Sequence, residues 1–237
     1  MPIAPPAAPI DRPKAARRCA STVAAGLVIA VLFGLAGCSW FRPDIEKSAP
    51  ELASDGMDAY KSKNYKDAIK AFEHLKDWYP FSKYAMLAEL KIADANYKLG
   101  NYEEAVYAYQ SFENLHPRNE AIPYVIYQAG MCYFEQIDTV DRDQTPARKA
   151  IKIFRRLTSR FPGNVYAIRA QPHISKCLKS IAGHEVYVGK FYYKAKHYRA
   201  ALHRFKTVLT KFPDVGYHNE ALRYIRLCQA VLADDQS

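Results

Sequence analysis

Few residues of this 237-residue chain have the type and spacing that chemistry at a site requires. His197 and His203 are six residues apart, and the zinc motif HExxH, with histidines four apart, is absent. Asp138, Asp141 and Asp143 share a short stretch that lacks the glycine and the distal glutamate of a calcium-binding EF-hand loop. No glycine-rich phosphate loop and no nucleophile elbow are present. We therefore expect a non-enzymatic protein with no catalytic residue, no metal site and no cofactor.

The five cysteines are too few and too scattered to form a disulfide framework. Cys19 and Cys38 belong to the N-terminal stretch discussed below. Cys132, Cys177 and Cys228 stand among apolar neighbours, and we expect them to be buried free thiols.

A stretch of sixteen residues that ends in proline occurs four times, at 65–80, 102–117, 147–162 and 198–213. Apolar positions at i, i+3 or i+4, and i+7 predict an amphipathic helix in each copy, which the proline ends. Counting back from the proline, an alanine recurs twelve residues earlier and an aromatic residue eight earlier. These residues are Ala68, Ala105, Ala150 and Ala201, and Phe72, Tyr109, Phe154 and Phe205.

This pattern is typical of the second helix of a tetratricopeptide (TPR) repeat. In three copies a small residue stands twelve residues before the alanine, where the first helix of the pair should approach its partner closely: Gly56, Ala93 and Gly189. In the third pair Gly130 precedes Ala150 by twenty residues, so the eight extra residues predict a loop at 138–145.

The predicted fold is an all-α TPR superhelix of about ten helices, or five helix pairs, with no strand. The expected helices are 51–64, 65–79, 82–99, 102–115, 120–137, 146–160, 166–182, 184–196, 198–211 and 217–232. We expect residues 51–117 to hold N-terminal pairs 1 and 2, and residues 118–237 to hold the C-terminal pairs and the closing helix.

Residues 1–37 have the features of an export signal. Four basic residues between Arg12 and Arg18 precede an uncharged apolar segment at 20–37. At 18 residues this segment could also barely span a bilayer, so an uncleaved anchor is an alternative.

The sequence Leu35-Ala36-Gly37-Cys38 resembles the bacterial lipobox, in which the cysteine is lipidated and begins the mature chain. Acyl chains on Cys38 would hold the protein on a membrane surface without spanning it. By resemblance to proteobacterial lipoproteins, a serine after the cysteine, here Ser39, favours export of the protein to the outer membrane. Residues 38–50, with two prolines, are expected to form a lipidated tether.

The formal net charge is +10, which falls to about +7 when the four basic residues and one acid of residues 1–37 are removed. The remaining charges are spread along helices, so we expect a solvated helical surface rather than a nucleic-acid site.

With lipobox, repeats and loop together, the chain resembles the BamD (ComL) family of outer-membrane assembly lipoproteins over residues 39–232. The segments that carry the resemblance are WYPFSKYA (78–85), DRDQTPARKAI (141–151), RFPGNVYAIRA (160–170), HEVYVGKFYYKAKHYRAALHRF (184–205) and KFPD (211–214). The resemblance implies a periplasmic scaffold, lipid-anchored to the outer membrane. Its C-terminal repeats would hold a BamA-like β-barrel insertase, its N-terminal repeats would receive unfolded outer-membrane proteins, and other assembly lipoproteins would be partners.

The residue four positions after each small residue should face the groove of a TPR array. These residues are aromatic: Tyr60, Tyr97, Phe134 and Tyr193. The next residues are Lys61, Lys98, Glu135 and Lys194. Such rings and lysines could bind a segment that ends in an aromatic residue with a free carboxylate. Alternatively, the rings merely cover the seam between helices.

The resemblance makes the loop with Asp138, Asp141, Arg142 and Asp143 a contact for a partner protein. A TPR lipoprotein of pilus or secretin assembly is the alternative function; it would share the lipobox and repeats but not the DRDQTPARKAI segment. A cell-envelope enzyme or its regulator would need a catalytic constellation that is absent. A cytoplasmic TPR protein would conflict with the N-terminal signal.

Overall fold

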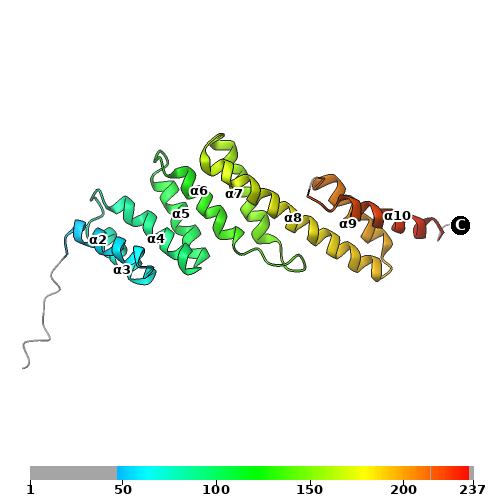
Figure 1. Cartoon of the computed structure of the whole chain (residues 1–237), viewed down its shortest axis with the longest axis horizontal. Coiled ribbons are helices and arrows are strands. Elements are labelled where there is room, and N and C mark those ends of the chain that lie inside the picture. Colours follow the sequence, from blue (N-terminus) through cyan, green and yellow to red (C-terminus); the bar gives the residue numbers. More distant parts are fainter. Residues whose placement is uncertain (1–46, 214, 235–237) are drawn as a thin grey trace, which may run out of the picture. The chain divides into compact units, whose positions relative to one another are not determined.

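The computed structural model describes residues 47–213 and 215–234, and it contains only helices there (Figure 1). The nine helices in these ranges are α2 (Ala49–Lys61), α3 (Tyr65–Trp78), α4 (Ala85–Leu99), α5 (Tyr102–Leu115), α6 (Ile122–Phe134), α7 (Thr145–Arg160), α8 (Val165–Lys194), α9 (Tyr198–Lys211) and α10 (His218–Asp234). The predicted all-α class is confirmed. The predicted signal, Cys38 and residues 38–46 of the tether lie outside the described residues.

Each helix packs against the next one along the chain, and α6 also contacts α8. The turns between helices follow from local sequence. Gly100 ends α4 in the left-handed conformation, with φ 79°, which is accessible to glycine at little cost. Ser48 is the N-cap of α2 and forms a capping box with Glu51.

The close approach predicted at the small residues is observed in three pairs, where the glycine of the first helix faces the ring of the second. A Cβ atom added at Gly56 would lie 2.6 Å from Phe72, one at Gly130 would clash with Phe154, and one at Gly189 would lie 2.8 Å from Phe205. All three rings are fully buried. Because these distances are too short for a side-chain carbon, only glycine allows the two helices of these pairs to come this close.

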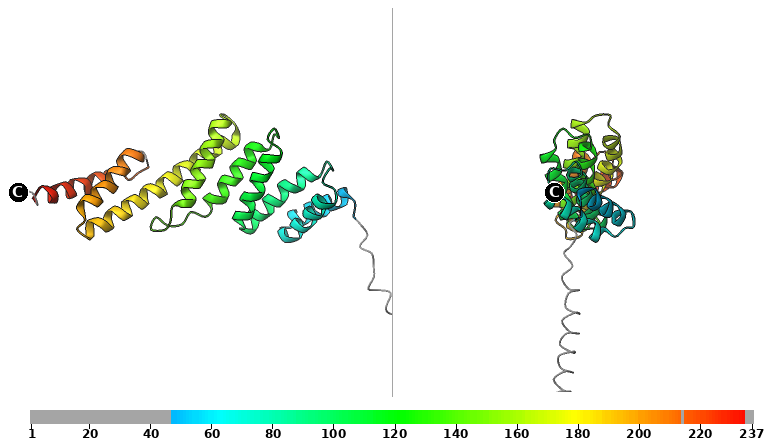
Figure 2. Two further views of the ribbon diagram at one scale, coloured as in Figure 1. Left: turned by 180° about the vertical axis from the view of Figure 1, so that it is seen from behind. Right: turned by 90° about the vertical axis from the view of Figure 1, so that its left-hand side faces the viewer.

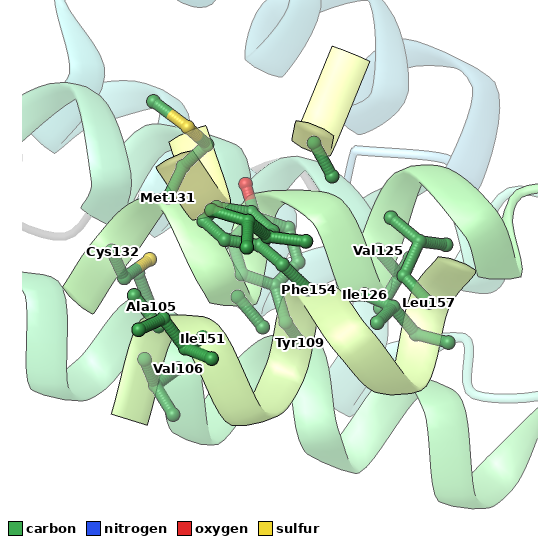
Figure 3. Close-up of a cluster of buried hydrophobic side chains, with 14 of the residues drawn as sticks. Ala105, Val106, Tyr109, Val125, Ile126, Met131, Cys132, Ile151, Phe154 and Leu157 are labelled. Atoms are coloured by element: carbon green, nitrogen blue, oxygen red, sulfur yellow. The ribbon is translucent and has the colours of Figure 1, made fainter. Parts of the chain in front are cut away.

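The buried side chains form three clusters. One lies in α2–α4, the largest extends from α4 to α8, and one lies in α8–α10. Figure 3 shows Phe154 in the middle of the largest cluster, with Tyr109, Val125, Ile126 and Ile151 around it. Cys132, Cys177 and Cys228 are buried free thiols, as predicted. Burial raises the pKa of Cys132 and Cys177 to about 12, so neither thiol is activated for chemistry.

One predicted break is wrong. The expected helices 166–182 and 184–196 are a single helix, α8, which runs through Gly183 (Figure 2). Gly183 is buried, and a Cβ there would lie 2.7 Å from Cγ1 of Val140 and 2.8 Å from the hydroxyl of Tyr217. The glycine therefore permits close packing rather than a turn. In the described ranges the array has nine helices instead of ten, and its class is unchanged.

None of the helices between residues 47 and 234 combines the length and the apolar character that crossing a bilayer would require.

Candidate functional site

Three of the four predicted groove rings have the same surroundings. Each tyrosine lies at the end of the first helix of a pair and meets, edge to face, a tyrosine that begins the second helix. The pairs are Tyr60–Tyr65 at 5.4 Å, Tyr97–Tyr102 at 5.8 Å and Tyr193–Tyr198 at 5.5 Å between ring centroids. All six rings are partly exposed. They therefore cover the seam of each pair and still present part of their surface to solvent.

Phe134 differs, because its main aromatic partner is His173 of α8, at 4.5 Å. His173 also stacks on Phe154 at 5.7 Å, and its Nε2 forms a 3.1 Å hydrogen bond with the hydroxyl of Tyr127. The ring of Phe134 thus helps to join α6 to α8.

The predicted lysines are exposed. Lys61 lies 3.5 Å from Asp58, and Lys98 lies over the ring of its neighbour Tyr97, 5.7 Å from the centroid. The lysine over Tyr60 is not Lys61 but Lys91 of α4, 4.9 Å from the centroid. A lysine therefore lies over each N-terminal ring; Lys91 is bonded to the carboxylate of Asp94, whereas Lys98 is exposed.

The sequence did not predict a role for Asp94, a buried residue of α4 near Tyr60. Asp94 of α4 is 2% exposed, and three side chains donate to its carboxylate. They are the hydroxyl of Tyr109 (2.8 Å), the hydroxyl of Tyr124 (2.6 Å) and the ammonium of Lys91 (2.7 Å). Because the donors come from α4, α5 and α6, one buried carboxylate joins three helices.

The pKa values of the tyrosines near Asp94 agree with a buried carboxylate at this place. Burial, and next the charge of Asp94, raise the pKa of Tyr60 to about 12. The same two causes raise the pKa values of Tyr109 and Tyr124 well above the usual value for tyrosine. The hydroxyls of Tyr109 and Tyr124 therefore keep their protons and donate to the carboxylate.

The first helices of pairs one to three and α8 form a continuous face, here called the first-helix face. Lys91 of α4 contacts Tyr60 of α2, Asp94 of α4 binds Tyr124 of α6, and Tyr124 meets Tyr166 of α8 at 5.4 Å. The structure brings Tyr97 together with Glu135, which follows the last residue of α6, with a 3.5 Å hydrogen bond. Tyr193 belongs to a different cluster, where it meets Tyr224 of α10 at 5.3 Å.

In the loop 138–145, the acidic side chains mostly hold the loop's own turns. Asp143 accepts hydrogen bonds from the backbone N–H and the hydroxyl of Thr145, and Asp141 accepts one from the hydroxyl of Thr139. Asp138 accepts from the backbone of Thr139. The hydrogen bond from the hydroxyl of Thr139 lowers the pKa of Asp141. A backbone hydrogen bond and the nearby Arg142 and His184 lower it further. Arg142 stays exposed.

Gln144 attaches this loop to α8. Its side chain is 2% exposed; it accepts a 2.7 Å hydrogen bond from Ser180 and donates to the backbone carbonyls of Thr139 and Arg142. His184 of α8 donates to the carbonyl of Val140 at 2.7 Å, next to Gly183. The loop is therefore held in one conformation against α8, which suits a surface that binds a protein.

We expect Gly183→Ala to displace the loop, because its Cβ would overlap Val140 and Tyr217. Such overpacking costs about 1–3 kcal/mol. Hydrogen exchange should become faster at the amides of residues 138–145, while Ser175→Ala, an exposed change on the same helix, should leave these rates unchanged. Equal rates in the two variants would contradict the packing role of Gly183.

One signal could have led to Asp94. The aromatic residue of the repeat is phenylalanine in three copies and tyrosine in the second, at position 109. A buried tyrosine hydroxyl needs a hydrogen-bond partner, so a polar residue near the small residue of that pair was to be expected. For Gln144 and Gly183 no comparable signal exists, because Ser180 lies 36 residues from Gln144, and Val140 and Tyr217 lie 43 and 34 residues from Gly183.

Paired helices with small-to-aromatic contacts, and first helices that touch in succession, define an all-α TPR protein. Within the described ranges no three histidine, cysteine or acidic side chains gather as metal ligands would. The structure offers two candidate surfaces at the predicted site residues, the first-helix face and the loop 138–145.

Comparisons with known proteins give the family of the chain. The profile of the YfiO family, described as outer membrane lipoprotein, matches residues 45–235. The outer membrane protein assembly factor BamD of Caulobacter vibrioides is 33% identical over 218 residues, covering 91% of this chain and 70% of that protein. The protein of the same name from Neisseria gonorrhoeae is 30% identical over 199 residues, covering 80% of this chain and 74% of that protein. A solved thermophilic TPR protein of Thermus thermophilus covers 75% of this chain and 99% of its own, at 15% identity and a TM-score of 0.41.

The chain belongs to the YfiO family of outer membrane lipoproteins, because the family profile matches every helix that the structure describes. The predicted membership of the BamD family is thereby confirmed.

Proposed function

We propose that this chain is a non-enzymatic scaffold of outer-membrane β-barrel assembly. The observation that carries the proposal is the family match over residues 45–235, together with relatives that are named outer membrane protein assembly factors. An array of helix pairs supports this role, because such arrays bind extended partners over a long surface.

In this proposal Cys38 is lipidated and attaches the chain to the periplasmic face of the outer membrane. The C-terminal repeats bind a BamA-like insertase, and the loop 138–145 contributes to a partner contact. Its attachment to α8 through Gln144 and His184 supports that part, since a fixed loop loses little conformational freedom on binding.

The test is co-purification. The full-length chain with a C-terminal tag is isolated from detergent-solubilised envelopes, with Cys38→Ala as the matched control for membrane attachment. A large barrel insertase should co-purify with the wild-type chain. Recovery of a secretin or pilus protein without any insertase would overturn the proposal and favour the alternative.

The first-helix face is the proposed substrate groove. Tyr60 and Tyr97 each combine a partly exposed aromatic surface with a nearby lysine. Lys91 beside Tyr60 is bonded to Asp94, so the exposed Lys98 beside Tyr97 is the cation available to a carboxylate. Aromatic rings pack against an aromatic side chain, and an ammonium group pairs with a terminal carboxylate. A barrel substrate whose chain ends in an aromatic residue with a free carboxylate offers both groups.

We expect the double variant Tyr60→Ala/Tyr97→Ala to bind a fluorescent peptide with such an end about tenfold more weakly than the wild type, because two aromatic anchors are lost. Fluorescence anisotropy gives the Kd. The same peptide with an amidated C-terminus should bind the wild type more weakly than the free acid does.

The matched control is Tyr65→Ala/Tyr102→Ala. It removes the same two edge-to-face contacts and leaves the proposed groove rings in place. If the two double variants lose affinity equally, the rings only stabilise the helix pairs, and the groove hypothesis fails.

A further inference from the structure

A second groove of the N-terminal pairs runs between α3 and α5 and over α4. We call it the α3–α5 groove; its volume is 660 Å³. Ile69 of α3, Ile92 of α4 and Ala108 of α5 contribute apolar surface to it. Two large side chains of α5, Tyr107 and Leu115, also line it. Their exposed fractions are 76% and 63%. Apolar surface of this kind next to a hollow often marks a binding site.

The polar lining of this groove is acidic. Glu73 of α3, Glu89 of α4, and Glu103 and Glu104 of α5 line it, against a single cation, Lys76. Glu89 bonds to His116 at 2.7 Å. Among the residues that the structure describes, Glu73, Glu103 and Glu104 have no ion-pair partner. An acidic groove on a chain of net charge +10 is a local exception.

The next groove along the array shows the contrast. It lies between α5 and α7, has a volume of 520 Å³, and is lined by Lys149, Lys152 and Arg156. There the acid Glu113 is neutralised by Arg156 at 2.5 Å and by Arg160 at 2.8 Å, so its charge joins α5 to α7. In the α3–α5 groove, Glu73, Glu103 and Glu104 form no such ion pair between helices, and their like charges repel each other unless a bound cation neutralises them.

We propose that the α3–α5 groove binds a basic amphipathic segment of another protein chain. Its apolar side chains would pack between Tyr107 and Leu115, and its lysines or arginines would pair with Glu73, Glu103 and Glu104. Charge complementarity selects this occupant, because an acidic segment would meet three unpaired carboxylates, whereas the neighbouring α5–α7 groove would suit it. This surface is separate from the first-helix face, so the proposal does not rest on the substrate groove.

The test uses the full lipid-anchored chain in nanodiscs of neutral lipid, with empty nanodiscs to subtract binding of the probe to lipid. The probe is a fluorescent helical peptide of leucine, alanine and lysine with its leucines on one face. A second peptide carries glutamate in place of each lysine. The wild-type chain should bind the lysine peptide at least tenfold more tightly than Glu103→Gln/Glu104→Gln does. Tyr107→Ala should also weaken binding severalfold.

The control Asp77→Asn/Glu120→Gln removes two negative charges at exposed residues that do not line the groove. Its affinity for the lysine peptide should equal that of the wild type. The proposal is overturned if the glutamate peptide binds as tightly as the lysine peptide. It is also overturned if the control and Glu103→Gln/Glu104→Gln lose affinity equally, since only general charge attraction would then act.

Discussion

Replacing Asp94 by alanine should lower the free energy of unfolding by about 3–5 kcal/mol, as expected when one partner of a buried charged network is removed. The hydroxyl of Tyr109 would lose its acceptor in a fully buried position, and Lys91 would lose its carboxylate. Urea unfolding of the purified chain, followed by far-UV circular dichroism, measures the change.

Asp94→Asn is the matched control. It keeps one oxygen that can accept from the tyrosine hydroxyls and loses the charge, so the expected cost is about 1–2 kcal/mol. If Asp94→Ala were no less stable than Asp94→Asn, the three hydrogen bonds would not join α4, α5 and α6 as described.

Phe154→Ala should be similarly destabilising, by about 3–5 kcal/mol, because the ring is fully buried and its removal leaves a cavity. The ring fills the space against Gly130 and stacks on His173 of α8, so the variant loosens the contacts of α7 with both α6 and α8. The same unfolding measurement gives this free energy.

A double-mutant cycle with Gly130 tests the contact itself. Gly130→Ala alone should cost about 1–3 kcal/mol, because its methyl group clashes with the ring. In Phe154→Ala the same methyl group would fill part of the cavity. The double variant should therefore be less destabilised than the sum of the two single variants. Strict additivity would show that Gly130 and Phe154 do not limit the approach of α6 to α7.

The fold was predictable because its determinants are local in sequence. Each pair needs a small residue and a ring at a fixed spacing, and four copies repeat it, so Gly130 and Phe154 could be matched although eight extra residues separate them. The continuity of α8 through Gly183 could not be predicted, because a glycine can serve a turn or a close approach. Which of these applies depends on Val140 and Tyr217, which are distant in sequence.

The candidate surfaces were predictable only in part. The recurring positions of Tyr60 and Tyr97 follow from repeat geometry, and the structure adds that each ring also covers the seam of its pair. The partners of Asp94 were hidden, since they lie 15 and 30 residues further along the chain and meet only after three helices pack. The acidic character of the α3–α5 groove likewise arises from glutamates on three helices, none of which is unusual alone.

The measurement that tests the central claim most directly is the folding of outer-membrane barrel proteins when this chain is depleted in the bacterium that produces it. The folded fraction of a barrel protein can be read from its heat-dependent migration in gels. If the chain is an assembly factor, this fraction should fall on depletion and recover when the wild-type chain is supplied, but not when Cys38→Ala is supplied. Normal levels of folded barrel proteins throughout depletion would contradict the proposed function.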